Sequence, residues 1–447
     1  MSDNQCLMAA DRFRQVLAHA VSLLDSWLET MRSPDGYSGP VVHWWQDCLL
    51  YTGAGLDWRY EGIILGYLNL YRNTGEEQWL VKARVAGSDL VQGQLPSGNF
   101  RNSCFERNPG TGGTPHEASC DRALIALAQV LRERGDPEWE TYAETARRNL
   151  EGYILRALWD EEGRFFRNTP WDATFVPNKA ATIAEALIAW ADLMEEDRLL
   201  NRYVFPTLDK IVAAQIRAPG HLLDGAIEQG VMGREGTGRF FPFYIARCIP
   251  ALIQGYERSE REVYRTAARA AMAFLLRVRR PDGSFPQVVY RNGRINEYPR
   301  WVAGVGDILR AMDIMRRYEM DITAEPTLAY LLRGQQAHGG ISTAQGFSAQ
   351  DGRILSARPD VRDLLPVCGW VDKAFHYLTG LVCRGDVLSA TGPLPELEVE
   401  CEFQGERCRY RETPTIVEVR GENGRYYRWI KGAPWAAWKR KIWAGLT

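Results

Sequence analysis

The sequence lacks the motifs that identify several large enzyme classes. It contains no P-loop, no Gly-x-Gly-x-x-Gly after a strand, no Gly-x-Ser-x-Gly elbow and no His-Glu-x-x-His. These motifs bind phosphates, hold a nicotinamide cofactor, present a serine nucleophile or ligate a catalytic zinc. Their absence disfavours phosphoryl transfer, nicotinamide chemistry, serine hydrolysis and zinc proteolysis.

Signals for export, membrane insertion and thiol chemistry are missing as well. The first residues contain no apolar core of signal-peptide length, and no stretch approaches the roughly 18 apolar residues of a membrane-spanning helix. The nine cysteines are irregularly spaced and include no Cys-x-x-Cys pair, so neither a zinc ribbon nor a redox motif is indicated. The net charge of −2 gives no reason to expect a nucleic-acid partner. We therefore expect a cytoplasmic protein with reduced thiols.

Aromatic residues, by contrast, are plentiful. The 447 residues include 15 Trp, 19 Tyr and 15 Phe, whereas the hydrophobic fraction of 45% and the charged fraction of 25% are ordinary for a folded protein. A folded protein uses tryptophan to fill its core, to stack on sugar rings or to wall an apolar cavity. The aromatic content is thus the compositional feature that bears on function.

Amphipathic helical stretches recur in pairs along the chain. The first member of each pair carries many charges, as in the stretch from Glu138, which is typical of a helix with one wet face. The second member is apolar around most of its circumference, as in the stretches from Asp121 and Trp301, and must be covered on several sides. The six pairs are 8–31 with 57–73, 77–93 with 119–134, 137–158 with 178–195, 198–216 with 240–257, 260–279 with 300–318, and 325–336 with 366–383.

The economical packing of these pairs is a closed ring, with the apolar helices inside and the charged helices wrapped around them. The expected fold class is all-α, an (α/α)6 toroid of six helical hairpins over residues 1–384. Links from an outer to an inner helix are long, about 20 to 30 residues, and loops of that length are uncommon unless they are functional. All of them would emerge at the same end of the ring, where we expect the site.

Several charged helices exit through a related turn. Clear copies are 94–100, 280–285 and 335–341, and 160–166 is a looser copy. In each, a glycine supplies the positive-φ position after the helix, and an aromatic residue or Ile returns the chain to the core. We interpret these turns as a structural repeat.

The pattern changes after residue 384. Stretches 397–403, 415–419 and 426–430 alternate or are β-branched, and 421–424 reads as a hairpin turn. We expect residues 385–447 to form a small β-rich C-terminal appendage packed on the toroid. Its last residues mix basic and aromatic side chains, which is compatible with a peripheral membrane contact on the cytoplasmic face or, as we favour, with a clamp on the toroid.

Six hairpins with Gln-x-Pro-[Asp/Ser]-Gly-x-Phe turns resemble the α/α toroid superfamilies over residues 8–383. One branch contains six-hairpin glycosidases, polysaccharide lyases and sugar epimerases, and the other contains terpenoid cyclases and protein prenyltransferase β-subunits. Residues 372–381 are similar to a prenyltransferase segment whose His ligates zinc, here His376. The preceding inner helix has no Cys to complete that ligand set, and the Asp-x-Asp-Asp motif of terpene cyclases is absent. We therefore expect no metal and no cofactor.

Histidines gather in or just after the long loops, which is the strongest functional signal in the sequence. Because imidazole exchanges protons near neutral pH, a mouth ringed with it suits acid–base chemistry. Carboxylates share these loops, although Asp121 and Asp372 could instead cap helices. The candidate catalytic residues are His116, Asp121, Asp224, Glu228, Asp372 and His376. The candidate substrate-binding residues are His43, Trp44, Arg239, Arg300, Trp301 and Trp370.

The sequence favours a carbohydrate-active enzyme that acts on an acidic or polar glycan or oligosaccharide. In a lyase or epimerase, His116 or His376 would remove a proton while Arg239 or Arg300 neutralises the sugar carboxylate. In a glycoside hydrolase, Asp121 or Asp224 would be the general acid, opposite Glu228 or Asp372. The expected partner is a small-molecule or oligosaccharide substrate. The alternative is an isoprenoid-handling protein of the cyclase and prenyltransferase type, with a dry aromatic cavity.

Overall fold

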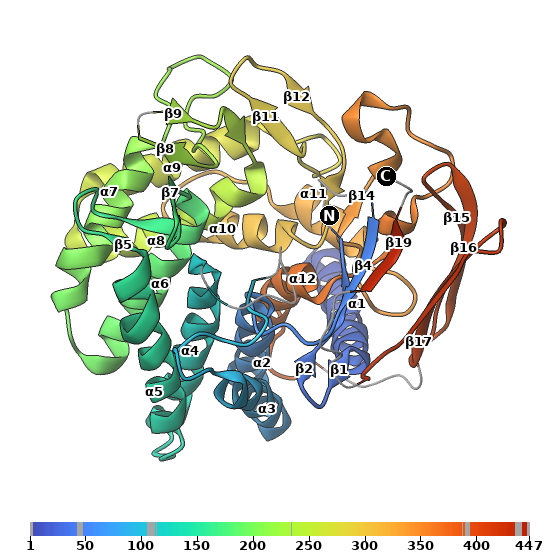
Figure 1. Cartoon of the computed structure of the whole chain (residues 1–447), viewed down its shortest axis with the longest axis horizontal. Helices are drawn as coiled ribbons and strands as arrows, with labels where there is room; N and C mark the ends of the chain where they lie inside the picture. The colour runs from blue at the N-terminus through green and yellow to red at the C-terminus, as the bar shows by residue number, and fades with distance from the viewer. Residues whose placement is uncertain are drawn as a thin grey trace.

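A computed structural model describes residues 3–42, 48–104, 112, 114–233, 235–386, 388, 394–433 and 440–444. Within them, six inner helices form a ring in which each contacts the next, and the last packs against the first (Figure 1). The fold is therefore the (α/α)6 toroid expected. The inner helices are α2 (Arg59–Thr74), α4 (Ala118–Glu133), α6 (Pro177–Met194), α8 (Pro242–Ser259), α10 (Val305–Arg317) and α12 (Cys368–Gly380).

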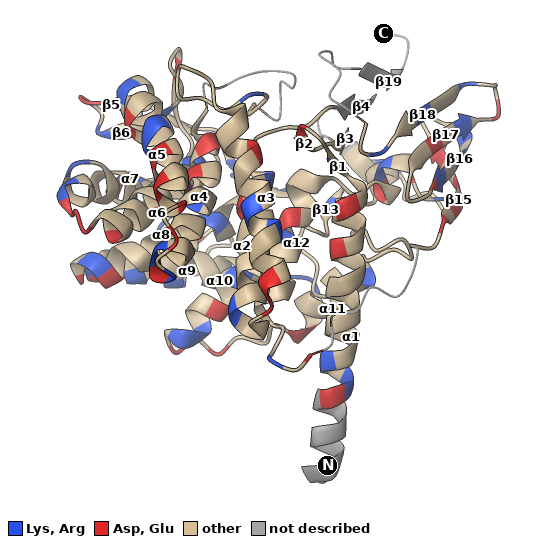
Figure 2. Ribbon diagram, turned by 90° about the horizontal axis from the view of Figure 1, so that it is seen from below, with Lys and Arg blue, Asp and Glu red and all other residues tan. Residues whose placement is uncertain are grey.

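Six outer segments wrap this ring. Their burial follows the sequence pattern: α9 buries a stripe that contains Tyr264, Ala268, Met272 and Leu275, whereas α6 is buried around most of its circumference. Lys and Arg positions and Asp and Glu positions are both spread along the ribbons of the outer helices (Figure 2). The outer segments are α1 (Asp3–Thr30), α3 (Glu77–Gly93), α5 (Trp139–Asn149) with the π-helix η3 (Leu150–Leu158), the π-helix η4 (Leu200–Val204) with α7 (Phe205–Ala213), α9 (Glu262–Val278) and α11 (Glu325–Arg333).

Short strands tie the long loops to one another. Strands from the third and fourth loops form one antiparallel sheet in the order β5-β6-β7-β8-β9, the fourth and fifth loops pair through β10-β11-β12, and the fifth and sixth through β13-β14. These loops therefore meet at a common end of the ring, as the sequence predicts. The strands are β5 (Trp159–Asp160), β6 (Phe165–Thr169), β7 (Asp172–Phe175), β8 (Val231–Met232), β9 (Glu235–Gly236), β10 (Arg239–Phe240), β11 (Val288–Tyr290), β12 (Ile295–Asn296), β13 (Arg300–Trp301) and β14 (Ala344–Gln345).

Two of the repeated turns fasten an outer helix to the next one through a glutamine side chain. Gln94 Nε2 donates to Gly98 O at 3.0 Å within its own turn and to Thr145 O on α5 at 2.7 Å. Gln335 Nε2 does the same with Gly339 O at 2.9 Å and with Ala20 O on α1 at 2.8 Å, which closes the outer ring. The turns have the structural role expected of them.

Two turns differ from the expectation. The stretch 160–166 is the β-hairpin that joins β5 to β6, in which Asp160 accepts from the Gly163 amide at 2.7 Å, and not a copy of the glutamine turn. A further copy follows α7, where Gln215 Nε2 donates to Gly225 O and to Ala267 O on α9, both at 2.9 Å. The extra residues between Gln215 and Gly225 hide this copy in the sequence.

The C-terminal part is a four-stranded antiparallel sheet of β15 (Leu397–Phe403), β16 (Glu406–Glu412), β17 (Ile416–Gly421) and β18 (Tyr426–Ile430). The hairpin expected at 421–424 joins β17 to β18. The sequence did not reveal β16, because arginines alternate along it and cover its exposed face.

A buried carboxylate joins this sheet to the toroid. Glu412 at the end of β16 accepts from Trp27 Nε1 of α1 at 3.0 Å, lies 3.1 Å from His338 Nε2 and 2.6 Å from Lys431 Nζ, and accepts from the Tyr410 hydroxyl. A buried charge is tolerated only with such partners. The sheet is thus packed on the outer ring.

The last strand of the chain belongs to a different sheet. The backbone of β19 (Arg440–Ala444) pairs with β4 (Cys48–Thr52) of the first long loop, and β4 pairs with β3 (Gly39–Val41). This pairing agrees with the clamp that we favoured for the tail, and a membrane contact stays a prediction. No helix in the described ranges is long and apolar enough to cross a membrane.

Candidate active site

A pocket of about 280 Å³ opens where the loops meet the first turns of the inner helices. Its wall combines aromatic rings with hydroxyl, amide and charged groups, a mixture typical of sites for small polar ligands. The described residues that line it are Trp58, Glu61, His116, Ser119, Asn168, Thr174, Val176, Asn178, Lys179, Thr182, Gln229, Gly230, Thr237, Phe243, Tyr244, Arg247, Trp370 and Lys373.

Aromatic rings from different hairpins form one wall. The Trp58 and Trp370 rings meet edge to face at 5.7 Å between centroids, and Phe243 meets Trp370 in the same way at 5.1 Å. Trp301 lies behind this wall, stacked on Trp370 at 4.3 Å. Such contacts hold large apolar faces in fixed orientations. The wall is therefore preorganised to receive a flat or ring-shaped ligand.

His116 stands against this wall. It lies in the short 3-10 helix η2 (Pro115–Glu117) that precedes α4, and its ring meets Trp58 at 4.4 Å between centroids. Burial lowers the pKa of His116 well below its ordinary value, and the nearby Lys179 and Lys373 lower it further. The imidazole is consequently neutral near pH 7, which is the state that a general base needs before it takes up a proton.

The residue after His116 anchors this short helix. Glu117 is fully buried and accepts from Asn99 Nδ2 at 2.9 Å, Asn149 Nδ2 at 2.7 Å and Ser103 Oγ at 2.5 Å. Burial raises the pKa of Glu117, and the three side-chain donors oppose that rise. Through Glu117, the preceding loop and α5 fix the place of His116.

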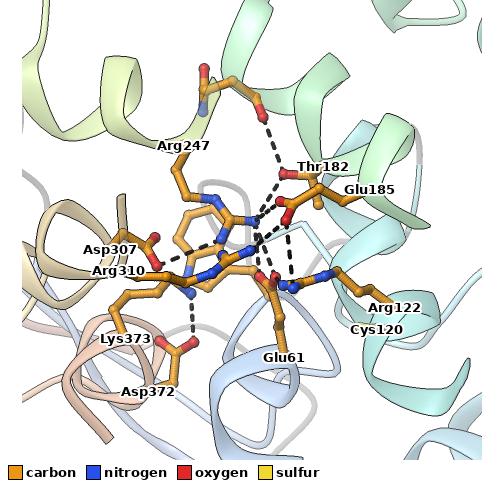
Figure 3. A network of polar contacts seen from close by, with 12 residues as sticks. Glu61, Cys120, Arg122, Thr182, Glu185, Arg247, Asp307, Arg310, Asp372 and Lys373 are labelled. Carbon is orange, nitrogen blue, oxygen red and sulfur yellow. Dashed lines mark hydrogen bonds and ion pairs between the residues drawn. The ribbon is translucent and has the colours of Figure 1, made fainter. Parts of the chain in front are cut away.

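The floor of the pocket contains Glu61 and Arg247, which belong to a network of charges from α2, α4, α6, α8 and α10 (Figure 3). Arg247 of α8 lies at its centre, where its guanidinium donates to Glu61 Oε2 at 3.0 Å and to Thr182 Oγ1 at 3.2 Å. It also lies 3.7 Å from Glu185 of α6 and 3.6 Å from Asp307 of α10. A single buried arginine thus connects four inner helices.

Two further arginines complete the network. Arg122 of α4 forms ion pairs with Glu61 and with Glu185, the latter at 3.5 Å, and Arg310 of α10 lies 2.5 Å from Glu185. Burial acts to raise the pKa of Glu61, but Arg247 and Arg122 outweigh it and hold that pKa well below its ordinary value. Glu61 is therefore an ionised carboxylate and not a proton donor near neutral pH.

Helix α12 adds an adjacent ion pair, Lys373 with Asp372. Lys373 Nζ lies 2.5 Å from Asp372 Oδ2, and Lys373 lines the pocket whereas Asp372 lies behind it, fully buried. Burial raises the pKa of Asp372 to about 7, although Lys373 opposes this shift. Lys373 Nζ also lies 6.0 Å from the centre of the Trp58 ring. The ammonium group of Lys373 is thus held beside the aromatic wall.

Of the residues singled out in the sequence, His116 and Trp370 line the pocket. Trp301 and Asp372 lie directly behind lining residues. His376 lies one turn beyond Asp372 on α12, where burial foremost, and then Arg310 and Arg122, keep its pKa well below the ordinary value. His43 and Trp44 lie outside the described residues.

The other predicted carboxylates do not line the pocket. Asp121 is fully buried in the first turn of α4, and both of its oxygens lack a hydrogen-bond partner among the described groups. Burial raises the pKa of Asp121 well above its ordinary value. Asp224 accepts from the Ala218 amide at 2.9 Å and stabilises its own turn. Glu228 forms an ion pair with Arg291 outside this pocket.

The predicted arginines and two histidines of the long loops also lie outside the pocket lining. Arg300 lies 2.8 Å from Glu297 and is already neutralised, and Arg239 is exposed on β10. His221 Nδ1 accepts from the backbone amide two residues later at 3.1 Å, and His338 Nδ1 does the same at 3.1 Å. The gathering of histidines thus reflects turn structure as well as the site.

Sequence reasoning missed most of the polar lining. The signal that could have found it is a charge one or two turns inside an otherwise apolar helix, because such a charge must face the pore or a partner. In the described part of the chain, no group of three or more His, Cys, Asp or Glu could hold a metal ion. The missed charged residues of the lining are Glu61, Lys179, Arg247 and Lys373, and those of the network behind it are Arg122, Glu185, Asp307 and Arg310.

No protein-family model matches the sequence, and no curated protein matches it. Solved structures do match the fold. A D-mannose isomerase aligns with a TM-score of 0.59 at 12% identity, over 81% of this chain and 96% of that one. The cellobiose 2-epimerase of Bacillus thermoamylovorans aligns with a TM-score of 0.58 at 13% identity, over 79% and 94%.

An unsaturated glucuronyl hydrolase specific for heparin also aligns, with a TM-score of 0.57 at 13% identity, over 83% of this chain and 96% of that one. At such identities the alignments establish architecture. The chain has the (α/α)6 toroid fold that these solved structures share.

Proposed function

We propose that the protein is a carbohydrate-active enzyme that performs acid–base chemistry on an acidic sugar or oligosaccharide in this pocket. The observation that carries the proposal is the neutral, buried His116 held against Trp58 inside a pocket that also contains cations. Similarity to a sugar isomerase, an epimerase and a glucuronyl hydrolase supports the substrate class.

The charge of the lining supports an acidic substrate. Lys179, Arg247 and Lys373 line the described pocket, whereas Glu61 is the single carboxylate among the described lining residues. Arg247 and Lys373 also pair with acidic side chains, whereas Lys179 Nζ donates to the neutral Asn168 side chain. In a partly desolvated site, three cations and one carboxylate in the lining favour an anionic ligand such as a sugar carboxylate. The aromatic wall offers Trp58 and Trp370 to the apolar face of the sugar ring.

The described lining residues also favour proton abstraction over hydrolysis by two carboxylates. Hydrolysis needs a protonated carboxyl opposite an ionised one. Glu61 is held ionised by Arg247 and Arg122, and Asp121, Asp224 and Glu228 lie outside the described lining. An epimerase, isomerase or lyase reaction therefore fits the described residues better than the hydrolase alternative.

In such a reaction, His116 removes the proton from the carbon next to a carbonyl or carboxylate group. Negative charge then develops on the oxygen of that group, and Lys373 and Arg247 stabilise it because they are already fixed in the pocket. When the carbon presents its opposite face to the imidazolium, return of the proton gives an epimer, whereas delivery of the proton to the neighbouring carbon gives an isomer. Departure of a leaving group from the next carbon, with the proton held on His116, gives an unsaturated sugar and restores the neutral imidazole.

The isoprenoid alternative requires a dry aromatic cavity. The pocket has an aromatic wall, but four inner helices contribute charged side chains to its lining, namely Glu61, Lys179, Arg247 and Lys373. These charges support the sugar proposal over the isoprenoid one.

The test is incubation of the protein in D2O with D-glucuronate, digalacturonate, cellobiose and D-mannose, followed by NMR and by absorbance of unsaturated sugar. We expect conversion of an acidic sugar, with deuterium at the attacked carbon, and its loss in His116→Asn. The matched control is His221→Asn, which alters an exposed turn. Full conversion by His116→Asn, or binding of a polyprenyl diphosphate with no conversion of any sugar, would overturn the proposal.

A further inference from the structure

The hairpin of β6 and β7 presents an exposed tryptophan beside the pocket. Trp171 at its tip is 73% exposed, and it is the one exposed tryptophan among those whose side chains the structure describes. Asn168 and Thr174, three residues to either side, line the pocket. The hairpin therefore runs from the pocket wall out to an indole in solvent.

Side-chain hydrogen bonds stiffen this tip. Asp172 accepts from Asn168 Nδ2 at 2.7 Å and from the Thr174 amide at 3.0 Å. Asn168 Oδ1 in turn accepts from Lys179 Nζ of α6 at 3.0 Å. The hairpin that carries Trp171 is thus held by the same residues that shape the pocket, so its backbone has little conformational freedom to lose when a ligand binds.

The adjacent hairpin extends the apolar surface. Strand β8 pairs with β7 through Val231 opposite Phe175, which brings the turn between β8 and β9 to the same end of the sheet as Trp171. Met232, the last residue of β8, is 62% exposed. The two neighbouring hairpins thus each present one large apolar side chain to solvent.

We propose that Trp171 is the platform for a second sugar subsite, on which a distal residue of an oligosaccharide stacks while the terminal residue occupies the pocket. The inference deepens the proposed function and rests on it, since it names a chain of sugars, rather than a monosaccharide, as the substrate class. The flat indole offers its face to the axial C–H groups of a sugar ring, and sugar hydroxyls stay in water. Trp171 is three residues from Asn168 of the pocket wall, so one linear oligosaccharide would extend from the pocket to the indole.

The test is calorimetric binding of D-galacturonate and hexagalacturonate, and of glucose and cellohexaose, to wild-type protein and to Trp171→Ala. We expect a hexasaccharide to bind wild type more tightly than its monosaccharide. The substitution should weaken hexasaccharide binding about tenfold, as loss of one stacking contact implies, and should leave the monosaccharide unchanged. Trp171→Phe should keep most of the hexasaccharide affinity.

The matched control is Tyr426→Ala, which removes a half-exposed aromatic from β18 of the C-terminal sheet and should change neither affinity. Unchanged hexasaccharide binding by Trp171→Ala, equal weakening for both chain lengths, or no binding of either hexasaccharide to wild type would overturn the inference. If one of these binding results is found and the protein still converts monosaccharides, the inference is wrong but the proposed function is upheld. Length-dependent binding without conversion would instead refute the proposed function alone.

Discussion

Trp58 and His116 meet edge to face with 4.4 Å between their ring centroids, although they belong to successive long loops. The Trp58 indole also donates to Gly369 O at the start of α12. Three hairpins are thereby connected at the point where the imidazole enters the pocket. The contact excludes water from one side of His116 and helps to keep the imidazole neutral.

The pH profile of turnover should show this neutral state. Because the pKa of His116 lies well below the ordinary value of about 6.5, the base stays unprotonated in mildly acidic solution. We expect the acid limb of kcat/KM against pH to fall below pH 6.5. An acid limb at or above the ordinary histidine value would show that another group is the base.

Arg247→Met should lower stability strongly. The substitution leaves Glu61, Asp307 and Glu185 buried without their shared cation. Loss of one partner of a buried ion pair costs about 3 to 5 kcal/mol, which urea unfolding will measure. Arg265→Met removes a surface arginine of α9 and should cost less than about 1 kcal/mol. Similar losses for the two variants would contradict a structural role for the network.

Two glycines with similar backbone angles should respond differently to alanine. Gly98 and Gly75 have φ of +89° and +77°, but a Cβ at Gly98 would lie 2.5 Å from Arg148 O, whereas one at Gly75 meets nothing within 4 Å. Gly75→Ala should therefore cost only the left-handed strain of about 1 kcal/mol. Gly98→Ala must also displace α5 and should lower the midpoint of urea unfolding further. Equal midpoints would show that the turn does not fasten α5.

Acid should loosen the contact of the C-terminal sheet. Burial acts to raise the pKa of Glu412, but His338 and Lys431 outweigh it and hold that pKa well below the ordinary value. The stabilisation is therefore present above the unfolded-state pKa of about 4.3 and declines as pH falls below it. Glu412→Gln should be less stable at pH 7 by about 3 kcal/mol and should lack that decline. Parallel stability curves for wild type and variant between pH 2.5 and 7 would contradict the assignment.

Helices were the part of the structure that the sequence predicted well, because their apolar period is local. The stretch 77–93 coincides with α3, and the other helices agree within a few residues at most ends. Strand β16 was missed because its arginines obscure the alternation of Cys408, Tyr410 and Glu412 on the buried face.

The site was harder to predict because it exists only after the ring closes. Glu61 and Arg247 are 186 residues apart in sequence and form an ion pair across the pore. Asp224 and Glu228 were both candidate catalytic residues, but they lie in an irregular loop and face different surroundings. His116 was found because a histidine at the start of an inner helix marks the mouth by its place in the repeat.

The most direct test of the account is a crystal structure of His116→Asn with the acidic sugar that wild type converts. We predict the sugar ring against Trp58 and Trp370, with its carboxylate near Lys373 and its reacting carbon facing residue 116. A sugar bound at another surface, with this pocket unoccupied, would contradict the account.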